Sequence, residues 1–275
     1  MRIAVLTLLA LVAFAANSVL TRAALLGGDI DAASFTLIRI ASGAVMLAAL
    51  LALRGDKPWT AGSWASAAAL MIYAVAFAFA YNSLDAGLGA LILFGMVQLT
   101  MFAGGLATGE RPSLLRWAGM GLGMAGLVLL LLPGAARPPA LGLGLMLIAG
   151  IGWGVYSLQG RKSVDALANT AGNFLRASPI ALVVWLGFAQ GPIGGNGAMF
   201  AVASGALASG LGYAIWYAAL PRLDASLAAV AQLSVPIIAL WGGVIWLDEG
   251  IGLRFAIASV MVLGGVGVAV FSRSR

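Results

Sequence analysis

The chain has 275 residues, of which 62% are apolar and 9% charged, whereas a water-soluble domain carries about a quarter charged residues. This composition and the mean hydropathy of +1.05 exclude a soluble protein and predict one that lies in a lipid bilayer. The lack of cysteine and histidine excludes disulfides, the usual zinc sites and imidazole proton relays, and the net charge of +6 comes from scattered residues rather than a nucleic-acid-binding face.

Apolar runs fill most of the chain and are separated by short breaks rich in glycine, proline and charge. One crossing of the hydrocarbon core needs about 20 apolar residues, so each run is long enough to span a membrane. We expect helices at residues 3–24, 32–53, 61–81, 86–107, 113–132, 141–159, 169–189, 197–218, 224–246 and 252–271. The sequence therefore predicts an all-α integral membrane protein with ten transmembrane helices and no soluble domain.

The basic residues of the loops indicate how the chain is oriented, because cytoplasmic loops are enriched in lysine and arginine. Placing the N-terminus inside assigns the larger set to the cytoplasm: Arg2, Arg54, Lys57, Arg111, Arg116, Arg161, Lys162, Arg222, Arg273 and Arg275. The opposite loops then hold the smaller set, Arg22, Arg137 and Arg254. We expect a multi-pass protein of a bacterial-type inner membrane with both termini in the cytoplasm.

The two halves of the chain resemble each other at a fixed offset. Asp85 and Asp224 are 139 positions apart, as are Glu110 and Glu249, and acidic residues are rare in this sequence. Further pairs at that offset are Ser18 with Ser157, Arg22 with Arg161, Gly104 with Gly243 and Gly126 with Gly265. Five crossings per half make the second half enter the membrane from the opposite side. We expect inverted five-helix repeats, residues 1–134 and 140–275, around a central cavity, as in many secondary transporters.

Several local patterns accompany this layout. An arginine lies early in the second predicted helix of each half, at Arg39 and Arg176. The ninth predicted helix carries Leu233-Ser234-Val235-Pro236, and the fourth and ninth end in Gly109-Glu110 and Asp248-Glu249. Together with glycine-rich last helices, these features resemble the drug/metabolite transporter superfamily and, within it, the EamA-type exporters. The resemblance covers the whole chain.

The resemblance implies an exporter of small metabolites that works by alternating access. Within the superfamily the chain looks most like exporters of aromatic and other neutral amino acids. It departs from the family pattern at Val97, where the first half would match Pro236, and at Asp248, which replaces the glycine of a Gly-Glu pair.

Ionisable residues inside a span are functional candidates, because a charge at the helix centre costs about 2.5–3.5 kcal/mol on insertion scales. No Asp or Glu maps to the middle of a predicted span. We therefore expect facilitated transport without proton exchange at a membrane-embedded carboxylate. Arg39 and Arg176 lie roughly 10 Å inside their spans. They either attract a substrate carboxylate or bind carbonyls at broken helix ends and extend to the interface, and we favour the second, structural role.

Aromatic and neutral polar residues are the candidates for substrate binding. Tyr73, Phe77 and Tyr81 repeat every four residues and therefore share one helix face. Rings on several helices favour a cavity for apolar or aromatic side chains, although they would also fill space between helices. Neutral polar groups would meet the charges of a zwitterion or hydrogen-bond neighbouring helices. The remaining candidates are Asn17, Gln98, Trp153, Tyr156, Tyr213, Trp216, Tyr217, Gln232 and Ser234. Pro236 should kink the ninth helix and serve as a gate.

The main alternative to a transporter is an intramembrane enzyme. The absence of histidine removes serine–histidine and HExxH chemistry, and no mid-membrane aspartate pair appears. Asp29-Ile30-Asp31 mimics a glycosyltransferase metal pair but more readily caps the helix that follows. We expect no enzymatic activity, no cofactor, no metal and a functional monomer. The alternative functions are a multidrug exporter or a carrier of phosphorylated or nucleotide sugars, which should expose several basic residues to the cavity.

Overall fold

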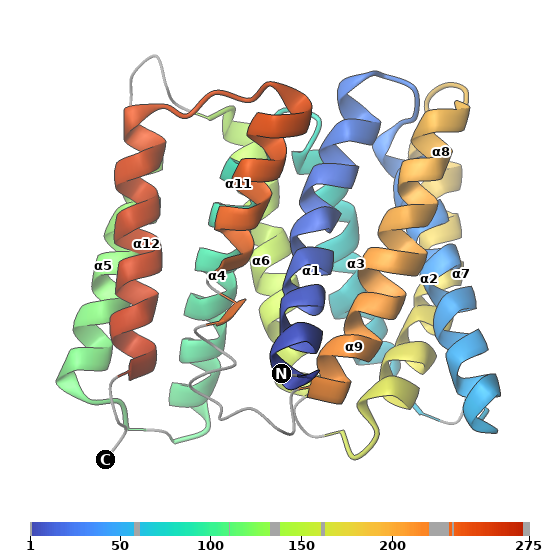
Figure 1. Cartoon of the computed structure of the whole chain (residues 1–275), viewed down its shortest axis with the longest axis horizontal. Helices are drawn as coiled ribbons and strands as arrows, with labels where there is room; N and C mark the ends of the chain where they lie inside the picture. Colours follow the sequence, from blue (N-terminus) through green and yellow to red (C-terminus); the bar gives the residue numbers. More distant parts are fainter. Residues whose placement is uncertain are drawn as a thin grey trace.

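The computed structural model describes residues 2–57, 61–109, 111–132, 138–160, 163–219, 231–232 and 234–271. All regular structure in these ranges is helical, and the helices form one bundle (Figure 1). Their bounds are α1 (Arg2–Leu26), α2 (Ala32–Arg54), α3 (Trp64–Ala80), α4 (Ala86–Ala107), α5 (Leu114–Leu131), α6 (Ala140–Gly160), α7 (Ala166–Phe188), α8 (Gly195–Val202), η1 (Ala203–Leu211), α9 (Gly212–Ala219), α11 (Ser234–Leu247) and α12 (Leu253–Phe271).

Six of the described helices are long and apolar enough to cross a membrane, and four more are shorter but apolar. One of the six joins α8, η1 and α9 into a single span. The expected all-α architecture with ten helices is therefore confirmed for the described part of the chain, with most ends within a few residues of those predicted. The predicted start of the ninth helix at residue 224 lies outside the described residues, as do Glu110, Asp224 and Arg161.

Side chains at the helix starts explain where several helices begin. The carboxylate of Asp31 accepts hydrogen bonds from the backbone N–H groups of Ala33 and Ser34, both at 2.9 Å, and so caps α2. Burial alone would raise the pKa of Asp31, but the bonds from Ser34, Gln190 and Ala33 lower it below its ordinary value. Asp29-Ile30-Asp31 thus supplies the predicted helix cap.

The middle of the eighth span is a π-helix, η1, which the sequence did not predict. Its hydrogen bonds run five residues apart, and such segments are frequent at functional sites. Gly205 allows η1 to lie directly against α2, because a methyl group added there would overlap the Arg39 carbonyl. The π-helix η1 therefore packs against both α1 and α2.

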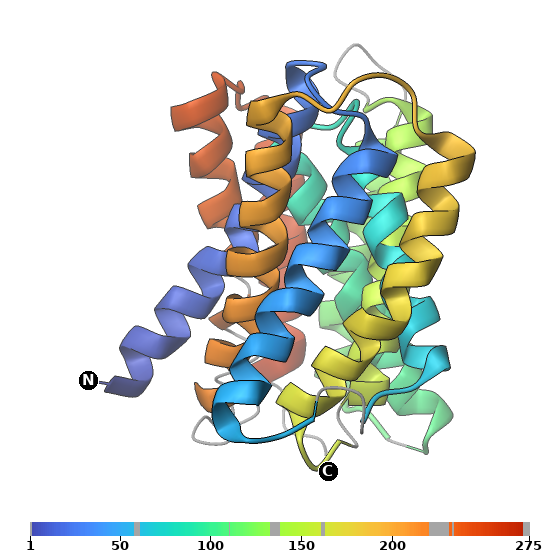
Figure 2. The same cartoon turned by 90° about the vertical axis from the view of Figure 1, so that its right-hand side faces the viewer.

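Helices from residues 2–132 pack mainly on helices from residues 140–271. The main pairs are α2 with α7 and η1, α3 with α6, α4 with α6 and α11, α1 with α9 and α11, and α5 with α12. The α5–α12 pair lies at one edge of the bundle and α2, α7 and α8 at the other (Figure 1). The first turns of α1 lean away from the bundle, and their apolar side chains Val5, Leu8 and Leu9 are exposed (Figure 2).

Glycines set the α5–α12 contact. A Cβ added to Gly265 would lie 2.5 Å from the Gly119 oxygen and 2.5 Å from the Gly123 nitrogen. The two backbones therefore touch, which is how small residues join membrane helices. The GxxxG pattern at Gly119 and Gly123 serves this structural role.

Candidate functional site

A buried arginine lies at the centre of the contact between α2, α3 and η1. Arg39 on α2 is 1% exposed. Its Nη2 donates a hydrogen bond to the Tyr73 hydroxyl at 2.9 Å, and Nε and Nη2 lie 3.3 and 3.4 Å from Ser209 Oγ. The guanidinium carbon lies 5.2 and 5.0 Å from the ring centroids of Tyr73 and Phe77, within cation–π range.

One donor group of Arg39 is left over. Its Nη1 is buried and has no hydrogen-bond partner. The ion pairs among the described residues involve Arg22 and Arg54, so no described carboxylate neutralises Arg39. A buried charge that is neither paired nor fully hydrogen-bonded is costly. Arg22 Nε also lacks a hydrogen-bond partner, but Arg22 forms ion pairs with Asp85 and Glu249, whereas Arg39 forms none with a described residue.

Polar side chains of α1 and η1 continue the site. Asn17 Oδ1 accepts hydrogen bonds from Ser204 Oγ at 2.8 Å and from Ser209 Oγ at 3.3 Å, and all three side chains are buried. In an α-helix two residues five positions apart would point about 140° away from each other. The π-helix brings Ser204 and Ser209 to the same side, because its hydrogen bonds join residues five apart. We call Asn17, Arg39, Tyr73, Phe77, Ser204 and Ser209 the Arg39 cluster.

Aromatic rings run from the Arg39 cluster across the bundle. The Trp153 ring stacks on Tyr213 with 5.3 Å between centroids, and lies 4.9 Å from Tyr73 and 5.4 Å from Tyr156. Phe14 contacts Tyr213 and Trp216 edge-on. We call Phe14, Tyr73, Trp153, Tyr156, Tyr213 and Trp216 the aromatic chain. Its rings come from α1, α3, α6 and α9 and pack against one another beside the Arg39 guanidinium.

Arg176 has a different environment from Arg39. Its Nη1 donates to the carbonyl oxygens of Ala61 at 2.7 Å and Gly172 at 2.9 Å. One of these carbonyl groups lies within its own helix α7 and the other in the segment before α3, which are contacts of the kind that the structural interpretation describes. The same interpretation does not describe Arg39, whose partners are side chains on neighbouring helices.

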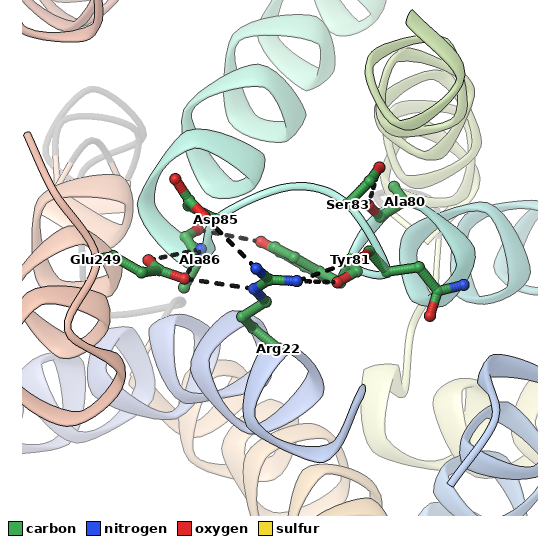
Figure 3. A network of polar contacts seen from close by, with 8 residues as sticks. Arg22, Ala80, Tyr81, Ser83, Asp85, Ala86 and Glu249 are labelled. Atoms are coloured by element: carbon green, nitrogen blue, oxygen red, sulfur yellow. Dashed lines mark hydrogen bonds and ion pairs between the residues drawn. The ribbon is translucent and has the colours of Figure 1, made fainter. Parts of the chain in front are cut away.

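A second polar cluster lies at the end of the bundle where α1 ends (Figure 3). Arg22 donates through Nη1 to the backbone oxygen of Tyr81 at 3.0 Å. Its Nη2 lies 3.7 Å from Asp85 Oδ1 and its Nε lies 3.6 Å from Glu249 Oε1. We call Arg22, Asp85 and Glu249 the Arg22 cluster. It connects α1, the turn between α3 and α4, and the segment after α11.

Glu249 caps a helix that lies far away in the sequence. Both carboxylate oxygens accept from the backbone N–H of Ala86, the first residue of α4, at 2.8 Å. The carboxylate also lies against Gly243, where any side chain would overlap it. Burial raises the pKa of Glu249, Asp85 raises it further, and the bond from Ala86 and the charge of Arg22 lower it only in part. The Glu249 carboxylate therefore holds the segment after α11 to the start of α4.

Comparison with known proteins decides the family. The model of the EamA-like transporter family matches residues 1–132 and 140–271. The chain belongs to this family. This EamA-family protein is therefore a multi-pass membrane transporter of the drug/metabolite transporter superfamily.

Individual relatives agree with that assignment. The transporter is 50% identical over 274 residues to the uncharacterized protein PA1977 of Pseudomonas aeruginosa, covering 99% of this chain and 96% of that one. It is 20% identical over 200 residues to the uncharacterized transporter YoaV of Bacillus subtilis, covering 70% of this chain and 68% of that one. A crystal structure of a 20% identical protein matches with a TM-score of 0.65 over 95% of this chain and 96% of its own, which shows a shared fold alone.

The structure of this EamA-family transporter brings together some of the predicted binding residues. Those that meet in the Arg39 cluster or the aromatic chain are Asn17, Tyr73, Phe77, Trp153, Tyr156, Tyr213 and Trp216. Gln98 and Gln232 are partly buried elsewhere, and Ser234 donates to the nearby Ala231 carbonyl. The side chain of Tyr217 lies outside the described residues, as do residues 220–230 and 233 on the N-terminal side of Pro236.

Tyr81 shares a helix face with Tyr73 and Phe77 yet belongs to a turn. Its hydroxyl donates to the Ala86 carbonyl at 3.2 Å, its ring packs over Gly89, and its backbone oxygen accepts from Arg22. The Tyr81 side chain therefore stabilises the connection between α3 and α4. Its role in substrate binding stays a prediction.

Three residues of the site are not among the predicted binding residues, namely Phe14, Ser204 and Ser209. Phe14 is the one aromatic residue of α1, and a single ring in a largely apolar helix gives no sequence pattern that marks it as a site residue. The two serines are visible in the sequence as polar groups at mid-span, but only the π-helix reveals that they act as a pair.

Proposed function

We propose that this transporter exports small zwitterionic metabolites, foremost aromatic or other neutral amino acids, across the bacterial inner membrane. The observation that supports this function is the aromatic chain beside one buried guanidinium. Aromatic rings can pack against the apolar side chain of such a solute. The neutral polar atoms of Asn17 and Ser209 can hydrogen-bond its charged groups, and neither residue adds a buried charge to the membrane.

Alternating access between two inverted halves is the mechanism we propose. Under a two-fold relation of residues 1–134 to 140–275, α2 corresponds to α7, α4 to α11 and α5 to α12, and each of these pairs packs together. The pairing of α3 with α6 would likewise correspond to that of α9 with α1, which also pack. The Arg22 cluster would hold one end of the bundle closed and separate when the solute passes.

The proposed transport is facilitated and uses no membrane-embedded carboxylate. Every described Asp and Glu lies outside the helices, while Glu110 and Asp224 are outside the described residues. A carrier of phosphorylated sugars would need several basic groups at the site, whereas Arg39 is the basic residue of the described cluster. We further propose that the monomer is functional, with both termini in the cytoplasm.

Counterflow in proteoliposomes tests this function. Purified protein is reconstituted, loaded with unlabelled solute and given labelled L-phenylalanine outside. We expect aromatic and neutral amino acids to exchange, and phosphorylated sugars and cationic drugs to compete poorly. Exchange should not depend on an imposed pH gradient. Electrogenic, pH-driven flux would contradict the facilitated mechanism, and exchange confined to sugar phosphates would contradict the substrate class.

A further inference from the structure

The unpartnered donor of Arg39 defines a binding site that no residue of the described chain fills. The guanidinium is 1% exposed, Nε and Nη2 face Ser209 and Tyr73, and Nη1 has no acceptor. A buried donor without an acceptor is expensive, and more so when it carries charge. An acceptor supplied by a bound solute would complete the hydrogen bonding of Arg39.

We propose that Arg39 binds the carboxylate of the transported solute, an assignment that rests on the proposed function and narrows its substrate class. The fork of a guanidinium matches the two oxygens of a carboxylate. A single positive charge suits one carboxylate better than a doubly charged phosphate. The rings of Tyr73 and Phe77, about 5 Å from the guanidinium carbon, place the apolar body of the solute in the aromatic chain. The site thus takes monocarboxylates with an aromatic or apolar body.

The geometry also indicates how the carboxylate reaches Arg39. The two contacts to Ser209 are long, at 3.3 and 3.4 Å, and join α2 to η1. Ser209 has a second partner in Asn17, so it keeps an acceptor when Arg39 turns away. A carboxylate therefore replaces the weakest contacts of Arg39, and its binding separates α2 from η1.

Arg176 is the matched comparison for Arg39. Both arginines lie early in a second helix of their half, but Arg176 donates to two backbone carbonyls. Its role is structural, so its loss should lower the amount of folded protein without changing which chemical groups the solute needs. A readout based on solute selectivity therefore separates the two roles.

Competition in the counterflow assay tests the proposal. L-phenylalanine and L-phenylalaninamide, which lacks the carboxylate, compete against labelled L-phenylalanine. Wild type should prefer the acid by roughly tenfold or more, the size of one hydrogen-bonded charge pair. Arg39→Gln should bring this preference close to one, Arg39→Lys should keep part of it, and Arg176→Gln should keep all of it. An Arg39→Gln protein that still prefers the acid tenfold overturns the proposal.

Thermal stabilisation of the wild-type protein in detergent keeps the proposal testable if Arg39→Gln does not fold. The probes are 3-phenylpropionate, 3-phenylpropionamide, phenethylamine and inorganic phosphate at equal concentration. We expect 3-phenylpropionate alone to raise the Tm. Equal stabilisation by the amide, or a larger effect of phosphate, overturns the carboxylate assignment. Stabilisation by 3-phenylpropionate together with no amino-acid counterflow would instead support Arg39 as the carboxylate site and reject amino acids as the cargo.

Discussion

Asn17 joins α1 to the π-helix, so its removal gives a measurable loss of stability. Asn17→Ala deletes the oxygen that accepts from Ser204 at 2.8 Å and Ser209 at 3.3 Å. Hydrogen bonds between membrane helices contribute about 0.6 kcal/mol on average and about 1.7 kcal/mol at most. Two such bonds, one of them long, therefore predict a loss of about 1–2 kcal/mol in the free energy of unfolding.

A double-mutant cycle isolates this contribution. Unfolding by SDS in mixed micelles is measured for Asn17→Ala, Ser204→Ala and the double variant. We expect the double variant to lose less than the sum of the single variants. Ser259→Ala is the matched control, because Ser259 donates within α12 to Phe255, and its effect should add to that of Asn17→Ala. Coupling between Asn17 and Ser204 no larger than that between Asn17 and Ser259 would refute the shared hydrogen bond.

Three further changes test other parts of the structure. The pKa of Glu249 is raised above its ordinary 4.5, so the folded protein holds this proton more tightly and loses stability as the pH rises from 4.5 through the folded-state pKa. The Tm of wild type relative to Glu249→Gln should therefore fall as the pH is raised from 4.5 to neutral. Gly265→Leu should destabilise the α5–α12 contact by about 1–3 kcal/mol in SDS unfolding, because Gly119 touches its backbone. Pro236→Ala should reduce counterflow more than membrane insertion, since the proline ring restrains the backbone in the first turn of α11.

Each of these changes has its own contradicting result. Parallel pH curves for wild type and Glu249→Gln would mean that the carboxylate titrates normally. Gly264 has open space around its Cα, so Gly264→Leu is the control, and equal stability of the two leucine variants would refute the close helix contact. Equal loss of transport and insertion in Pro236→Ala would assign the proline a structural role only.

The helices were predictable because a membrane imposes one rule on the whole chain. Every backbone polar group must be satisfied within the segment, so an apolar run of sufficient length becomes a helix. The caps followed from local chemistry, as at Asp31, where a short acceptor side chain precedes the first turn. These signals are read from neighbouring residues and need no knowledge of tertiary packing.

The roles of individual polar residues depended on tertiary packing and could not be read from the sequence. Arg39 and Arg176 look alike in sequence, but one contacts side chains and the other carbonyl groups. Tyr81 shares its spacing with Tyr73 yet turns toward the connection between α3 and α4. The π-helix leaves no mark in composition, because a shift of hydrogen bonding from four to five residues changes no residue type.

Counterflow of labelled aromatic amino acids by two tryptophan variants tests most directly whether the buried aromatic chain carries the solute. Trp153 stacks on Tyr213 inside the bundle, whereas Trp241 on α11 is 55% exposed on the outer surface. Both variants replace tryptophan by alanine, so they lose the same side chain and differ only in where it lies. We expect Trp153→Ala to lose roughly two- to tenfold of the exchange rate, by analogy with the loss of one stacking contact, and Trp241→Ala to match wild type. Equal rates for the two variants, at equal amounts of folded protein, would contradict the proposed site.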